Sequence, residues 1–156
     1  MKNLILISFL AISINLFGQG INITVTGNWM KTIAASDISE AGNDYPTAYT
    51  SNTNQTLLTI NPTNNKKQII VYVKRSDIAW HTALTLKVKR TGSGTTPNSI
   101  IGGGLIYQAI TNLDANFFTC EGYNTFVPLQ YEITGISVVL PVQSYATTIT
   151  YTVMHP

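Results

Sequence analysis

Ionisable side chains are scarce in this sequence: charged residues make up 10% of it, and His81 and His155 are the two histidines. No serine, cysteine or carboxylate near either imidazole stands in a nucleophile, metalloprotease or dinucleotide motif. Gly102 to Gly104 lack the Lys-Ser or Lys-Thr of a phosphate loop, so this run predicts a turn of the chain. We therefore expect no enzymatic activity, no catalytic residue and no cofactor.

Cysteine is nearly absent, since Cys120 is the only one in the chain. A single cysteine excludes an internal disulfide. Two interpretations stay open for Cys120: a small buried residue, or a thiol that pairs with another chain.

Long apolar runs are absent except at the N-terminus. Lys2 is followed by an apolar stretch from Leu4 to Phe17, and the small residues Gly18 and Gly20 come next. A charge, a short apolar run and a small-residue site are typical of a secretory signal. We predict a signal peptide over 1–20, cleaved near 18–20, with an uncleaved N-terminal anchor as the alternative. The run is shorter than the roughly 20 residues that span a bilayer, so we expect no transmembrane segment after its removal.

The residues that remain are rich in Thr, Asn, Ile, Val and Tyr, which favours strands joined by turns. Residues 21–156 have the usual length of one domain. Apolar and polar residues alternate strictly over 21–26 (INITVT). Further strands are predicted at 55–60, 67–75, 83–90, 105–111, 125–133 and 146–154. The predicted fold is all-β: a single antiparallel immunoglobulin-like β-sandwich of about seven to nine strands.

Two local features refine this picture. Pro128 lies inside a predicted strand and lacks a ladder N–H, so we expect an edge position or a bulge there. The segment 33–45 is predicted to hold one helical turn capped by Ser36 or Asp37. Asp37, Glu40 and Asp44 lie close together in the sequence and offer oxygen ligands for Ca²⁺. Their spacing matches no calcium loop, so we favour a solvated, capped turn and predict no metal site.

The final third carries a family resemblance. The segment VPLQYEITG, a short apolar strand over 136–141 (ISVVLP) and the segment SYATTITYTV follow one another from residue 127 to residue 153. This succession resembles the ends of secreted bacterial pilin-like and spore-coat-like domains, which close with a proline, a tyrosine-centred turn and a threonine-rich strand. Pro141, Tyr145 and residues 147–153 hold those places, whereas the disulfide usual in that family is absent. The resemblance implies an immunoglobulin-type sandwich with a surface or fibre role, and it carries over no catalytic residue.

Basic residues are concentrated in one part of the chain. Residues 66–90 contain seven lysines and arginines and one acid, whereas the rest of 21–156 contains one lysine and six acids. If strands 67–75 and 83–90 are neighbours in one sheet, their outward side chains form one basic surface with Trp80 and His81 at its end. The predicted ligand-binding residues are therefore Tyr72, Lys74, Trp80, His81, Lys87 and Lys89. Such a surface suits an anionic polysaccharide or another anionic polymer. The alternative is that these lysines protect edge strands against aggregation.

Trp29 and Trp80 each have two interpretations, an exposed platform for a sugar ring or a core residue. Residues 21–26 also have two: they fill a neighbouring subunit's groove, or they form the first strand of their own sandwich.

Export, low charge and threonine-rich strands together predict a secreted or cell-surface structural or adhesive module, such as a fibre subunit. We expect it to associate with itself or with other surface proteins, and we expect no specific nucleic-acid binding. The alternative function is binding of carbohydrate or of an anionic polymer through the basic surface.

Overall fold

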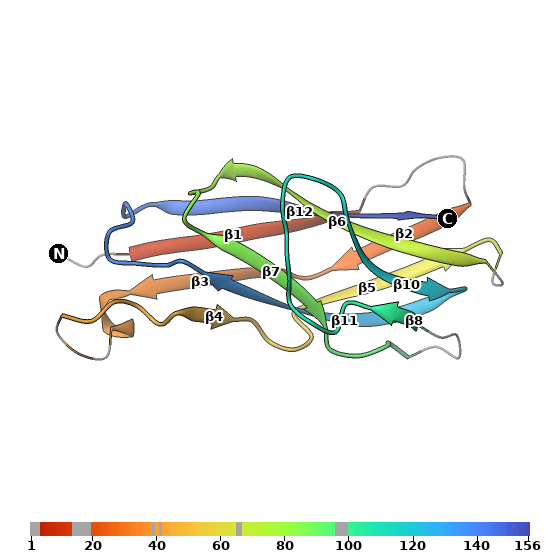
Figure 1. The fold of residues 1–156 in the computed structure, drawn as a ribbon, viewed down its shortest axis with the longest axis horizontal. Helices are drawn as coiled ribbons and strands as arrows, with labels where there is room; N and C mark the ends of the chain where they lie inside the picture. Colours follow the sequence, from red (N-terminus) through yellow and green to blue (C-terminus); the bar gives the residue numbers. More distant parts are fainter. Residues whose placement is uncertain (1–3, 14–19, 39, 41, 65–66, 96–99) are drawn as a thin grey trace.

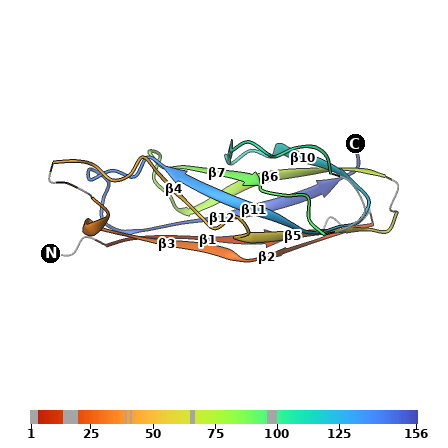
Figure 2. The same ribbon diagram turned by 90° about the horizontal axis from the view of Figure 1, so that it is seen from below.

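Two sheets packed face to face make up the computed structural model of the chain (Figures 1 and 2). It describes residues 4–13, 20–38, 40, 42–64, 67–95 and 100–156. The first sheet has the order β3-β1-β12-β6-β10-β8, and the second has the order β2-β5-β11-β7-β9, with β4 also paired to β11. The strands are β1 (Leu4–Ser13), β2 (Ile21–Thr26), β3 (Asn28–Ala34), β4 (Ala48–Thr50), β5 (Thr56–Pro62), β6 (Gln68–Ala79), β7 (Thr85–Arg90), β8 (Ile100–Gly103), β9 (Gln108–Ala109), β10 (Ala115–Glu121), β11 (Asn124–Thr134) and β12 (Ser144–Met154).

This arrangement confirms the predicted all-β sandwich of mostly antiparallel strands. The strand predicted at 21–26 has the bounds of β2, and those at 55–60, 67–75, 83–90, 125–133 and 146–154 overlap β5, β6, β7, β11 and β12. The predictions succeed where apolar residues alternate, because a strand turns successive side chains to opposite faces. In β6, Ile69, Val71 and Val73 are buried, and in β7 so are Leu86 and Val88.

The core lies between the sheets and is built from these alternating residues. Cys120 is buried there on β10, as the first interpretation predicted, and burial raises the pKa of its thiol to about 12. Trp29 is also buried and stacks on Tyr131, with 6.5 Å between the ring centroids. This contact decides the interpretation of Trp29 in favour of a core residue.

The apolar N-terminal stretch occupies a strand position inside the first sheet. β1 pairs in parallel with β12 and antiparallel with β3, and Ile7 is 1% exposed. The sandwich therefore includes residues that the sequence analysis placed ahead of the domain. A short apolar run has the same pattern in a leader and in a buried strand, so sequence does not separate the two. The signal peptide and its cleavage concern processing and remain predictions, and residues 14–19 lie outside the described part.

A single glycine carries the chain from one sheet to the other. β2 belongs to the second sheet and β3 to the first, and Gly27 lies between them with a φ of 107°. A Cβ at this position would lie 2.3 Å from the carbonyl oxygen of Gln55, so the crossing requires glycine. The Gln55 side chain donates a hydrogen bond of 2.6 Å to the carbonyl oxygen of Asn28 and holds the start of β3 in place.

Two predicted strands are corrected by the structure. Most of 105–111 is a loop, with β9 limited to Gln108–Ala109, because Gly103 and Gly104 turn the chain with φ values of 86° and 74°. The second correction concerns 136–141, the short apolar strand of the family resemblance, which is a turn between β11 and β12.

Besides β1, the strands that were not predicted from the sequence are β3, β4, β8 and β10. β10 escaped because the register shifts between Asn116 and Phe118, so the adjacent Phe117 and Phe118 are both buried and the alternation is broken. Pro128 lies in β11, which is not an edge strand, just after a register shift between Asn124 and Val127. The expected edge position is therefore wrong, and the irregularity lies just before the proline, which itself pairs with Leu57.

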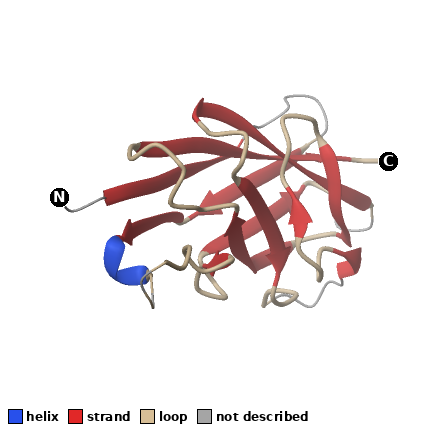
Figure 3. Cartoon of the chain, turned by 60° about the vertical axis from the view of Figure 1, so that its left-hand side comes forward, coloured by secondary structure: helices blue, strands red, loops and turns tan. Residues whose placement is uncertain are grey.

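The predicted helical turn is a single 3-10 turn, η1 (Ala35–Asp37), drawn in blue in Figure 3. Its N-cap is Ala34 rather than Ser36 or Asp37. Asp37 instead accepts a hydrogen bond of 3.3 Å from the backbone N–H of Ala34.

The sheets share a buried polar contact, because the hydroxyl groups of Tyr131 on β11 and Tyr151 on β12 lie 3.0 Å apart. Burial raises the pKa of Tyr131 to about 12 and raises that of Tyr151 well above its ordinary value. Tyr151→Phe removes one partner of this pair, and we expect a loss of about 1–3 kcal/mol in the free energy of unfolding. Urea denaturation of the full chain measures this loss.

The double variant Tyr131→Phe/Tyr151→Phe is the matched control. Because it removes both hydroxyls, we expect it to be less destabilised than the sum of the two single variants. If the loss in the free energy of unfolding of the double variant equals the sum of the two single losses, the two hydroxyls do not interact.

Candidate functional site

The predicted basic surface depends on β6 and β7 being neighbours, and this premise is wrong. β6 lies in the first sheet between β12 and β10, whereas β7 lies in the second sheet between β11 and β9. Both strands turn their apolar residues to the shared core, so their polar residues point away from each other. Tyr72 and Lys74 therefore lie on one outer face of the sandwich, and Lys87 and Lys89 lie on the other.

On the outer face of the first sheet, Lys74 is engaged by an acid from a distant part of the sequence. Its Nζ lies 3.0 Å from a carboxylate oxygen of Asp114. Tyr72 is half-buried and is flanked in the sheet by Thr152 and Asn116.

On the outer face of the second sheet, Lys87 and Lys89 also have partners. Lys87 forms an ion pair of 2.8 Å with Glu132 of the neighbouring strand β11. The Nζ of Lys89 lies 4.5 Å from the centroid of the Tyr107 ring, in cation–π geometry. Neither lysine is directed at an open site.

Trp80 and His81 directly follow β6, because Asp77, Ile78 and Ala79 belong to that strand rather than to a turn. The indole N–H of Trp80 donates a hydrogen bond of 3.1 Å to the carbonyl oxygen of Leu84, and the half-buried ring packs against the core. Nδ1 of His81 accepts a hydrogen bond of 3.2 Å from the N–H of Ala83. These contacts organise the β6–β7 connection, and the guanidinium carbon of Arg75 lies 5.2 Å from the centroid of the Trp80 ring.

The charge separation seen along the sequence is thus partly cancelled in space. Asp114 and Glu132, from the acidic part, pair with lysines of the basic part, and Arg75 pairs with Asp77. Arg90 is 6% exposed, and its Nε donates a hydrogen bond of 2.6 Å to the carbonyl oxygen of Gly103. The alternative function, binding of an anionic polymer, loses the support of one continuous basic surface. Lys66 lies outside the described residues.

The acidic residues of 37–44 also have separate tasks. Asp37 binds the N–H of Ala34, Glu40 accepts a contact of 3.5 Å from Asn43, and Asp44 binds residues of the β11–β12 turn. Within the described ranges, no group of three or more His, Cys, Asp or Glu side chains is placed to hold a metal ion. In the same part of the chain, no helix has the length and apolar character that crossing a membrane requires.

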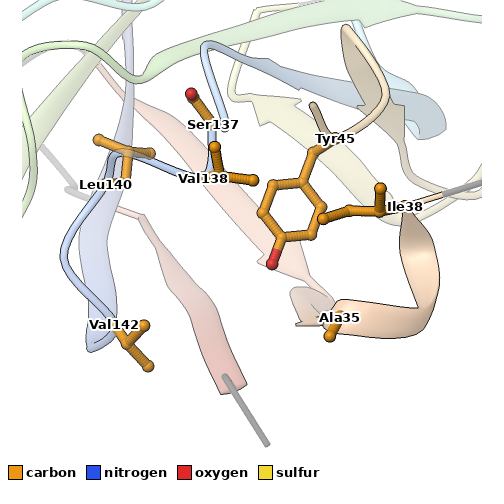
Figure 4. A pocket seen from close by; sticks show the side chains of 7 residues that line it. All are labelled: Ala35, Ile38, Tyr45, Ser137, Val138, Leu140 and Val142. Atoms are coloured by element: carbon orange, nitrogen blue, oxygen red, sulfur yellow. The ribbon is translucent and has the colours of Figure 1, made fainter. Parts of the chain in front are cut away.

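One hollow lies at the end of the sandwich where the β11–β12 turn meets η1 (Figure 4). Its lining consists of Ala35, Ile38, Tyr45, Ser137, Val138, Leu140 and Val142, and we refer to this set as the apolar end. The volume of the hollow is about 70 Å³. Small-molecule sites enclose about 300–1,000 Å³, so this hollow suits a contact with a side chain of another protein better than a free ligand.

Asp44 holds the apolar end together, a role that the sequence analysis missed. It accepts hydrogen bonds of 2.6 Å from the Ser137 hydroxyl and 2.8 Å from the N–H of Val138. The hydrogen bond from Ser137, followed by those from the N–H groups of Tyr45 and Val138, lowers the pKa of Asp44. No sequence signal reveals this clamp, because 93 positions separate Asp44 from Ser137.

Comparison with known proteins adds no identification. No family model matches the chain, and no curated protein matches it.

The Asp44 clamp makes the apolar end sensitive to acid. Because the folded pKa of Asp44 is lowered, the clamp is at full strength above the unfolded pKa, about 3.9, and weakens as pH falls through the folded value. We expect hydrogen exchange at the amide of Val138, corrected for the intrinsic pH dependence, to accelerate as the pH is lowered below about 4. Asp44→Asn is expected to show fast exchange already at neutral pH. Equal protection in both proteins at pH 7 would contradict this role.

Proposed function

We propose that this chain is an exported structural or adhesive module of the cell surface that associates through its apolar end with a second copy of itself. The observation that carries the proposal is that apolar side chains at this end of the sandwich are exposed to solvent and are not part of the core. Val138 and Val142 are 56% and 53% exposed, and both line the hollow together with Ile38 and Tyr45. Contiguous exposed apolar surface in a soluble domain is typical of a protein–protein contact.

The geometry also favours a rigid presentation of this surface. Asp44 fixes the β11–β12 turn to the segment that precedes β4, and the hydroxyl of Tyr145 donates a hydrogen bond of 2.7 Å to the carbonyl oxygen of Pro141. Both ends of the turn are therefore tied to the sandwich. A contact surface that is ordered before binding loses less conformational entropy when a partner docks.

Export is the first part of the proposal to test. We expect a chain expressed from its own start codon in a bacterial host to appear outside the inner membrane with a new N-terminus near residues 18–20. Intact-mass measurement of the exported protein gives the cleavage position. An unprocessed chain that stays in the cytoplasm would contradict export, and a full-length chain held at the membrane would indicate the uncleaved anchor.

Association through the apolar end is tested with Val138→Asp/Val142→Asp. Light scattering over a concentration series of the processed chain should show reversible oligomers. We expect the double variant to associate at least tenfold more weakly, because two buried carboxylates would lack partners at the contact, and a tenfold change corresponds to about 1.4 kcal/mol.

The matched control is Leu105→Asp/Ile106→Asp, which introduces the same two charges at exposed apolar residues in the loop before β9. It should associate like the unsubstituted chain, and all the proteins should melt at similar temperatures. A processed chain that is monomeric at every concentration, or oligomers that persist in the double variant, would contradict the proposal.

A further inference from the structure

β1 is an interior strand of the first sheet and lies between the edge strand β3 and β12. It forms a ladder with β3 along Leu4–Leu10 and a ladder with β12 along Leu6–Ser13, so both of its edges are paired (Figure 1). Ile7, its described inward residue, is almost fully buried. β1 is thus the link that joins β3 to the remainder of its sheet.

β1 lies within residues 1–20, whose composition predicts a signal peptide that is cleaved from the chain. Cleavage near residues 18–20 would take β1 away and leave β3 and β12 facing each other across an empty strand position. The two strands would lie two strand spacings apart, roughly 9.5 Å, which is too far for hydrogen bonds between them. Each would expose a row of backbone N–H and C=O groups without a ladder partner.

The walls of this position are mainly apolar, with the buried Thr147 as the polar residue on the β12 side. Trp29 and Ile33 of β3 face the core on one side, and Tyr145 and Ile149 of β12 face it on the other, each at most 6% exposed. The one charged residue of β3 is Lys31, whose Nζ lies 5.1 Å from the centroid of the Tyr49 ring. An occupant therefore needs apolar residues at every second position and no charge among those that point inward.

We propose that the processed chain carries a strand-acceptor slot between β3 and β12, and that an extended apolar segment of a separate partner polypeptide fills it. This proposal rests on the export that the proposed function includes. β1 shows how an occupant sits: it runs parallel to β12 and places Ile7 opposite Tyr145 and Lys31. Backbone ladders on both sides supply affinity, and the alternating apolar side chains supply selectivity.

The other strands of the described chain are poor candidates for the slot. β2, which the sequence analysis considered for exchange between subunits, is paired with β5 in its own sandwich and buries Ile21 and Ile23 there. β2 is the edge strand of its sheet, so moving it into a neighbour's slot would leave β5 without a ladder partner on that side. An exchange of β2 therefore gains no net burial.

β3 is also held away from β12. Closing the gap would move β3 by one strand spacing, which would pull Trp29 off the Tyr131 ring and break the 2.6 Å hydrogen bond from Gln55 to Asn28. These contacts stabilise β3 on the far side of the slot. The slot thus stays open until a strand from elsewhere enters.

The probe is a synthetic peptide of residues 4–13, extended with lysines for solubility and labelled for fluorescence anisotropy. We expect one peptide to bind each processed chain and to raise its melting temperature by about 4 °C or more, because a ligand that binds only the folded state stabilises it. The matched control is the same peptide with Ile7→Asp, which we expect to bind at least tenfold more weakly. Failure of both peptides to bind, or equal binding of the two, would overturn the slot.

A disulfide trap tests whether the slot closes by itself. Met30 and Ala146 both pair with Ser8, from opposite sides of β1, so they are two strands apart while the slot is open. Disulfides need Cα atoms about 4.4–6.8 Å apart, so Met30→Cys/Ala146→Cys should stay reduced in mild oxidant. Cys120 is buried and does not compete. A cross-link that forms within one processed chain would show that β3 has closed onto β12 and would overturn the proposal.

A further possible result of these experiments is that a second copy of this chain fills the slot. Oligomers of the processed chain that dissociate when the peptide is added would assign the slot to another copy and would overturn a separate partner. If the peptides do not bind while the apolar-end variants still weaken association, the slot alone fails and the proposed function stands.

Discussion

The contact between β11 and β12 is the interaction on which the two sheets depend. β11 is central in one sheet and pairs with β5, β7 and β4, while β12 joins β1 and β6 in the other. Each presents a row of buried residues to the other sheet, and the Tyr131 and Tyr151 hydroxyls meet within it. Because one hydroxyl donates to the other within the core, this buried polar contact ties the alignment of one sheet to that of the other.

Local alternation made much of the fold predictable. The burial of Ile69, Val71 and Val73 follows directly from a period of two, and so does the position of Cys120 on an inward face once β10 is known. β10 itself was missed because a bulge makes Phe117 and Phe118 both buried, and a bulge leaves no pattern in sequence. The immunoglobulin-type topology suggested by the resemblance remains a prediction, since the sandwich alone does not decide it.

The candidate site was much less predictable, for a physical reason. Outward orientation of Lys74 and Lys87 could be derived from each strand alone, but their shared surface required knowing which strands are neighbours. Sheet order depends on contacts between residues far apart in the chain, such as Glu132 with Lys87 or Asp44 with Ser137. One sequence contains no local signal for such pairs, so the ion pairs and the Asp44 clamp appeared only in the folded chain.

The crossing at Gly27 has a mechanical consequence. β2 and β3 form one covalent segment whose first half is bonded into one sheet and whose second half is bonded into the other. If the two sheets slide past each other along their strands, the covalent link at Gly27 between β2 and β3 is put under tension. A pull along the strands is therefore shared between both sheets, and it loads many ladder hydrogen bonds at once instead of opening them one after another.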